Sequence, residues 1–139
     1  MRQYQETLTI ETRGQSLTEF TRDVARIIKA AGMATGVAHV FCRHTSASLL
    51  IQENADPDVQ RDLLAFFKRL VPDGDPLFIH RAEGPDDMPA HVKTALTQTT
   101  LTVPISKGRM MLGTWQGIYL FEHRTRPHAR QIVIHVVGE

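Results

Sequence analysis

The sequence contains a single cysteine, Cys42, among its 139 residues. An internal disulfide is therefore impossible, and this sparing use of cysteine is typical of a reducing compartment, so we expect a cytoplasmic protein. An excess of one charge is also lacking, because 16 basic and 15 acidic residues leave a formal net charge of +1. Such a balance gives no general attraction to nucleic acid or to a membrane surface, and we expect neither as a partner.

Several familiar motifs are missing as well. No apolar run approaches the length of a membrane-spanning helix, and the N-terminus lacks the apolar core of a secretory signal. The sequence has no phosphate-binding P-loop, no dinucleotide-binding glycine fingerprint and no Gly-x-Ser-x-Gly motif. We therefore expect no nucleotide cofactor, and the common classes of nucleotide-hydrolysing and redox enzyme are disfavoured.

The pattern of apolar residues predicts one α+β domain over residues 1–139, with a mostly antiparallel, sandwich-like sheet, two main helices and one short helix. The apolar and β-branched segments predict strands over 4–12, 36–43, 99–105, 110–112, 117–122 and 131–137. The last of these is apolar at nearly every position, so we expect it to be buried on both faces, in the sheet or against another subunit.

Capping signals predict where the helices begin. Ser16 and Glu19 form a capping box that predicts a first helix ending at Gly32. Asp56 followed by a proline predicts a second helix with a buried apolar stripe that extends to residue 70. The third, short helix is expected over 89–96, with Asp87 just outside it, because the residue before a proline disfavours the helical conformation.

The stretch from His80 to His91 has the most distinctive composition. It holds two histidines and three carboxylates, those of Glu83, Asp86 and Asp87, within twelve residues. Clusters of this kind are enriched at metal and catalytic sites, although a capped surface loop is the alternative. His91 would fall in the first turn of the short helix, where the helix dipole favours a neutral ring that can act as a ligand or a base.

Three further segments carry polar side chains at predicted strand ends. His44-Thr45-Ser46 follows a buried strand and could hold a metal or a phosphate, or could simply form a turn. Trp115, the only tryptophan, lies near two glycines and beside Gln116, where it suits either a ligand-contacting wall or a core aromatic. Glu122 and Arg124 should share one strand face, as an exposed ion pair or as part of an anion and metal site.

These segments together predict a divalent-cation site for Mg²⁺, Mn²⁺ or Zn²⁺, because they supply oxygen and imidazole donors but no thiolate. Its expected ligands are His44, His80, Asp87 and His91, with Glu122 nearby. The residues expected to act in catalysis are His91, His44, Asp87 and Arg124. The residues expected to contact substrate are Thr45, Ser46, Asn54, Trp115 and Gln116.

Four of the segments, 44–48, 53–58, 83–93 and 112–122, resemble the YjbQ family, described as secondary thiamine-phosphate synthase enzymes. The resemblance extends from Tyr4 to Glu139. It implies an α+β domain that assembles as a homotrimer, with the shared polar residues in a cleft near the subunit boundary.

The activity that the resemblance implies joins a hydroxymethylpyrimidine diphosphate to a thiazole phosphate and releases pyrophosphate. A small phosphorylated metabolite is therefore the expected ligand, and a divalent metal is the expected cofactor. The alternative is a trimeric protein that binds a metal or a phosphorylated metabolite without turnover. Both functions require the same ligand-binding side chains, so the motifs alone do not separate them.

Overall fold

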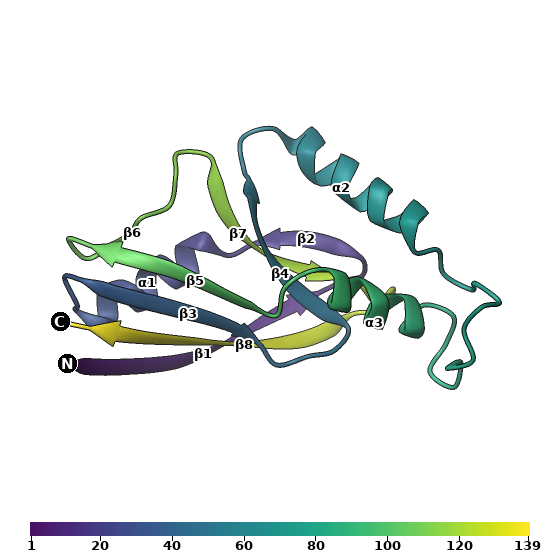
Figure 1. Cartoon of the computed structure of the whole chain (residues 1–139), viewed down its shortest axis with the longest axis horizontal. Helices are drawn as coiled ribbons and strands as arrows, with labels where there is room; N and C mark the ends of the chain where they lie inside the picture. Colours follow the sequence, from purple (N-terminus) through teal and green to yellow (C-terminus); the bar gives the residue numbers. More distant parts are fainter.

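Two antiparallel β-sheets and three helices make up the computed structural model, which describes residues 1–139 (Figure 1). The predicted α+β fold with a sandwich-like core is confirmed. The larger sheet has five strands in the order β1 (Arg2–Thr12), β8 (His128–Gly138), β3 (Gly36–Cys42), β5 (Thr100–Ser106) and β6 (Arg109–Met110). The smaller sheet has three strands in the order β2 (Ser16–Glu19), β7 (Gln116–Glu122) and β4 (Ala47–Glu53).

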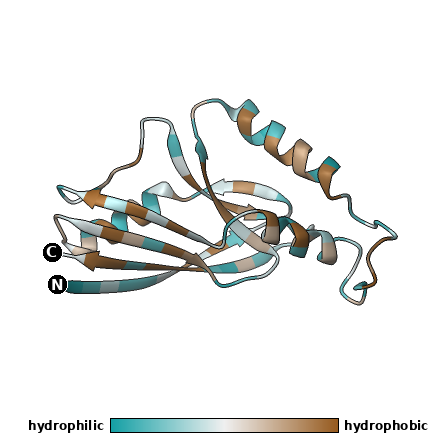
Figure 2. Cartoon of the chain, in the orientation of Figure 1, coloured by the Kyte–Doolittle hydropathy of each residue, from teal (hydrophilic) through white to brown (hydrophobic).

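Both sheets and the first helix, α1 (Thr21–Ala31), contribute to one hydrophobic core. Figure 2 shows the apolar stretches along β3, β5 and β8 that supply much of it. Along β8, Ile132, Ile134 and Val136 are fully buried, whereas Val133, His135 and Val137 are only half-buried and Gln131 is exposed. The prediction that this strand is buried on both faces is therefore wrong for the single chain, because only one face of the sheet meets the core.

The start of the first helix also differs from the prediction. Residues Ser16 to Glu19 form strand β2, which pairs with β7, and α1 begins at Thr21 without a side-chain cap. The pairing with β7 satisfies the backbone groups that a capping box would otherwise serve, so tertiary contacts override the local signal. The predicted end is confirmed, because Gly32 takes the left-handed conformation with φ 67°.

Helix α2 (Pro57–Leu70) begins as predicted but is not packed as predicted. The Asp58 backbone N–H donates to Asp56 Oδ1 at 2.9 Å, and Pro57 occupies the first helical position. No residue of α2 is buried in the single chain, and Phe66 and Leu70 are among its exposed apolar residues. The helix lies above one end of the sheets rather than flat on a sheet face (Figure 1), so its expected buried stripe is wrong for the single chain.

Two smaller differences concern strands. Strand β4 (Ala47–Glu53) is not among the strands predicted from the sequence. The strand expected over 110–112 is reduced to Arg109–Met110, which follows a turn at Lys107 and Gly108. No helix is both long and apolar enough to cross a lipid bilayer.

Candidate metal centre

The third helix, α3 (Asp87–Leu96), begins earlier than predicted and includes Asp87 in its first turn. The prediction that Asp87 lies outside this helix is wrong. The Asp86 carboxylate does not cap the helix but accepts hydrogen bonds from Arg124 Nε and from the Thr125 backbone N–H, both at 2.9 Å. These tertiary bonds fix the backbone ahead of the proline, and they place Asp87 and His91 four residues apart on one helix face.

Asp87, His80 and His91 form a compact cluster whose potential ligand atoms lie within 4.8 Å of one another. Asp87 Oδ2 is 2.8 Å from His80 Nε2 and 3.1 Å from His91 Nε2. The Asp87 side chain is 2% exposed, whereas those of His80 and His91 are 47% and 32% exposed. A buried carboxylate thus faces two imidazoles that a solute can reach.

The hydrogen bonds of His91 define which ring nitrogen can bind a ligand. His91 Nδ1 lies 3.0 Å from the carbonyl oxygen of Thr45, and because a carbonyl can only accept, Nδ1 carries a proton. In the neutral ring, Nε2 then presents a lone pair to Asp87 Oδ2, and two acceptors at this separation repel each other. A proton or a cation between them removes that repulsion. A carbonyl behind Nδ1 is also the usual support of a metal-binding histidine.

Arg124 supports the cluster from behind. Its buried guanidinium donates from Nε to Asp86 Oδ2 and from Nη1 to Asp87 Oδ1, both at 2.9 Å, and from Nη2 to the Glu83 carbonyl. The sequence predicted that Arg124 shares a strand face with Glu122, either as an exposed ion pair or as part of an anion and metal site. In the structure all three guanidinium nitrogens are engaged, so this side chain positions the Asp87 carboxylate.

Both acids of this network remain ionised. Burial raises the pKa of Asp86, but the hydrogen bonds from Arg124 and Thr125 outweigh burial and lower that pKa to about 2. For Asp87, burial also raises the pKa, and the hydrogen bond from His80 together with the charges of His91 and Arg124 produces a net lowering. Asp87 is therefore a carboxylate at neutral pH, as a metal ligand must be.

Two of the five predicted metal ligands lie outside the cluster. His44 Nε2 accepts a hydrogen bond from the Gln131 backbone N–H at 2.8 Å. Glu122 is fully buried, and its carboxylate accepts from Arg130 Nε at 2.7 Å and from Thr12 Oγ1 at 2.6 Å. Both residues therefore have partners inside the fold, and the structure brings together only His80, Asp87 and His91.

The residues expected to contact substrate fall into two groups. Thr45 supplies the carbonyl behind His91, and Ser46 accepts a hydrogen bond from Arg130 Nη2 at 3.0 Å. Asn54, Trp115 and Gln116 lie together at the other end of β7. A strand of seven residues spans roughly 20 Å, so in the single chain this second group does not reach the cluster.

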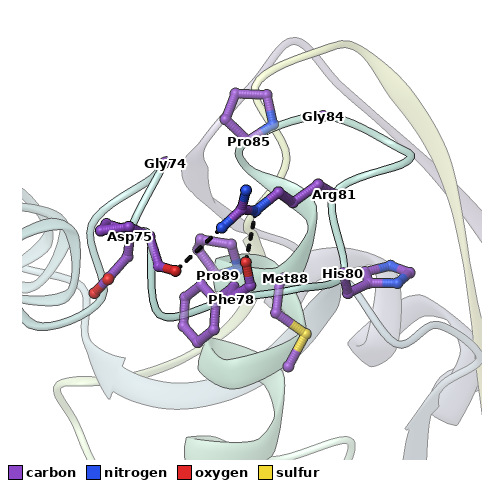
Figure 3. Close-up of a pocket in the computed structure, with 10 residues that line it drawn as sticks. Gly74, Asp75, Phe78, His80, Arg81, Gly84, Pro85, Met88 and Pro89 are labelled. Atoms are coloured by element: carbon purple, nitrogen blue, oxygen red, sulfur yellow. Dashed lines mark hydrogen bonds between the residues drawn. The ribbon is translucent and has the colours of Figure 1, made fainter.

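A cavity of about 380 Å³ adjoins the cluster, and His80 lies at its edge (Figure 3). The cavity is enclosed mainly by the loop between α2 and α3. Arg81 crosses it and donates from Nε to the Phe78 carbonyl at 2.7 Å, which holds this loop in shape. The space is large enough for a small organic ligand next to the imidazoles.

Sequence reasoning missed the support of Asp87 by Arg124 and the role of Asp86 in it, because the contact joins residues 37 and 38 positions apart in the chain. Their only sequence signal is the presence of acids and an arginine in separate polar segments. No spacing rule links such segments before the topology is known.

The protein is thus a small α+β sandwich with a candidate cation site at one end of its sheets. The loop before α3 and the first turns of α3 supply the His–Asp–His cluster of this site. Residues 6–139 match the family model described as UPF0047 protein YjbQ-like. The chain belongs to this UPF0047 (YjbQ) family, as the sequence resemblance predicted.

Relatives from several organisms agree with this assignment. A UPF0047 protein of Synechocystis sp. is 54% identical, over 99% of this chain and 94% of its own length. The UPF0047 protein YjbQ of Escherichia coli O157:H7 is 40% identical, over 98% of this chain and 99% of its own.

Solved structures show the same fold. A YjbQ/UPF0047 protein of Clostridium acetobutylicum is 32% identical with a TM-score of 0.86, covering 95% of this chain and 99% of its own. A YbjQ-like protein of Sulfolobus solfataricus P2 reaches a TM-score of 0.90 at 22% identity over 99% of both chains, a likeness of fold alone.

Proposed function

We propose that the chain binds a divalent metal ion through His80 Nε2, Asp87 Oδ2 and His91 Nε2. One observation carries this proposal: two imidazole nitrogens converge on a single carboxylate oxygen, and the protonated Nδ1 of His91 leaves the lone pair of Nε2 pointing at that oxygen. A cation held by all three atoms satisfies them at once.

The donor set favours a particular kind of metal. Two imidazoles and one carboxylate suit Zn²⁺ or another transition metal better than Mg²⁺, which prefers oxygen ligands and keeps its waters. Three protein ligands with the remaining positions open are typical of a catalytic site rather than a structural one. We therefore take Zn²⁺ as the first candidate, with Mn²⁺ as the second.

We further propose that the site processes a small phosphorylated metabolite. The family resemblance indicates the joining of a hydroxymethylpyrimidine diphosphate to a thiazole phosphate, in which a C–N bond forms, a C–O bond breaks and pyrophosphate leaves. A bound cation would neutralise the charge of the leaving pyrophosphate. Arg124 and Asp86 hold the Asp87 carboxylate in place, Thr45 orients the His91 ring, and the adjoining cavity offers room for the substrate.

Product analysis tests the activity. Metal-free protein should form no thiamine phosphate from the two precursors, and adding Zn²⁺ or Mn²⁺ should restore formation. His91→Ala removes a proposed metal ligand and should lower the rate by at least about tenfold. Changing a residue that only supports a metal ligand already lowers metal affinity or activity by about 10 to 100-fold. His39→Ala, which changes an exposed histidine on β3, serves as the matched control and should leave the rate unchanged.

The outcomes separate the two functions under consideration. Metal binding that depends on His91, without product, would support the binding protein and reject the synthase. Product formation that is equal in wild-type and His91→Ala protein would reject the site itself.

We also propose that the chain assembles as a homotrimer. The loop between α2 and α3 exposes Leu77 and Ile79, which are 77% and 94% exposed, and α2 exposes Phe66 and Leu70. Clusters of exposed apolar residues favour association, and a closed symmetric assembly covers them. Light scattering should give a mass three times the 15.7 kDa of one chain. A stable monomer at micromolar concentration would contradict this proposal.

A further inference from the structure

Lys93 has an environment that the cation cluster does not explain. It follows His91 by two residues on α3, so its side chain leaves a different face of the helix. The residue is only 4% exposed, and its ammonium makes no hydrogen bond and no ion pair within the fold, because the nearest favourable charge, that of Asp73, acts only at longer range. Buried lysines are rare, because removing an ammonium from water without giving it a partner destabilises the folded state.

The Lys93 side chain lines a cavity of about 320 Å³ that also contains Lys68 of α2. Two lysines from two different helices thus line the same cavity. The Gln15 side chain adds an amide, and Phe67 and Phe121, which pack edge to face with ring centroids 5.2 Å apart, form an apolar part of the lining.

The acids near this cavity do not neutralise the two lysines. Glu122 contributes to the lining, but Arg130, Thr12 and two backbone N–H groups occupy both of its carboxylate oxygens. Asp73 accepts a weak hydrogen bond from Gln15 Nε2 at 3.4 Å, and its charge favours the Lys93 ammonium only from beyond ion-pair distance. The cavity is therefore lined by two lysines and by one carboxylate that is already paired with Arg130.

We propose that this cavity binds a small oxyanion, the phosphate or carboxylate group of a metabolite, with Lys93 as its principal contact. Lys68 supplies a second positive charge, and the aromatic walls suit an apolar portion of the same ligand. An anion bound here would form an ion pair with the Lys93 ammonium, which has no such partner within the fold. None of His80, Asp87 and His91 lines this cavity, so the proposed anion site is separate from the proposed cation site.

Inorganic phosphate and pyrophosphate are suitable probes. They are titrated into chelator-treated full-length protein at constant ionic strength, so that no bound metal can attract them, and binding is followed by calorimetry and thermal unfolding. The wild-type protein should bind and its Tm should rise with ligand concentration. Lys93→Met should weaken binding by at least about tenfold, the value of one charge-assisted hydrogen bond.

Two further variants complete this test. Lys68→Met should weaken binding by a smaller factor of about three, whereas Lys29→Met, which removes an exposed lysine of α1, should bind as the wild type does. The proposal is overturned if wild-type protein binds neither probe up to about 20 mM, a very weak affinity. Equal affinity in wild-type and Lys93→Met protein also overturns it. If Lys93→Met failed to fold, an unchanged affinity of Lys68→Met for phosphate and pyrophosphate would overturn the proposal instead.

Discussion

Asp87→Ala should lower the affinity for Zn²⁺ by about 100-fold or more, because it removes the oxygen on which both imidazoles converge. Arg124→Lys should also weaken binding, by about tenfold, although it keeps the positive charge. A lysine cannot donate to Asp86 and Asp87 at the same time in the geometry that the guanidinium provides, so the Asp87 carboxylate would lose its fixed orientation.

Titration against a competing chelating dye measures these affinities, with circular dichroism to confirm that each variant is folded. His44→Ala is the informative control, because His44 belongs to the sequence-predicted ligand set but binds the Gln131 backbone in the structure. Its Zn²⁺ affinity should equal that of the wild type. Wild-type affinity in Asp87→Ala, or an equal loss in His44→Ala, would contradict the three-residue cluster.

Glu122→Gln should lower the free energy of unfolding by about 3 to 5 kcal/mol, which is the range for breaking a buried ion pair by removing one partner. Glu122 and Arg130 are both buried, and the arginine donates to both carboxylate oxygens. The glutamine leaves the buried guanidinium without a counter-charge. Chemical unfolding at neutral pH measures this effect.

The double variant Glu122→Gln/Arg130→Met tests the cause. If the unpaired arginine is responsible, removing it as well should recover part of the lost stability. A double variant that is less stable than Glu122→Gln by the full cost of a second, independent change would argue against a coupled pair.

Acid should diminish the effect of Glu122→Gln. Burial raises the pKa of Glu122, but the hydrogen bonds from Arg130 and Thr12 outweigh burial and lower that pKa below its ordinary value of 4.5. The carboxylate therefore stabilises the fold fully above the unfolded-state pKa, and this contribution is lost as the pH falls through the folded-state pKa. The difference in unfolding free energy between wild type and variant should be smaller at pH 3 than at pH 7.

The part of the site that could be predicted from the sequence is the part that is local in the chain. His80, Asp87 and His91 lie within twelve residues, and the helical spacing of Asp87 and His91 places both on one face. His44 and Glu122 were assigned to the same site because they are polar residues at strand ends. Whether such a residue meets a ligand or an internal partner depends on contacts between distant segments, which the sequence does not specify.

The fold shows the same division. Hydrophobic periodicity predicted most strands and all three helices, because burial of a face requires it. The capping-box prediction at Ser16 and Glu19 was wrong because the backbone of these residues forms hydrogen bonds with strand β7 instead. The apolar stripe of α2 was predicted correctly as a pattern, but the pattern does not say whether the covering surface belongs to the same chain.

The pairing of β1 with β8 places the two ends of the chain together. Arg2 is the register partner of Gly138, and both termini lie at the end of the larger sheet remote from α3 (Figure 1). A short turn would therefore be long enough to join the two termini covalently. An affinity tag or a fused domain at either terminus would therefore extend away from the His–Asp–His cluster, so the protein can be immobilised by its ends while the cluster faces solution.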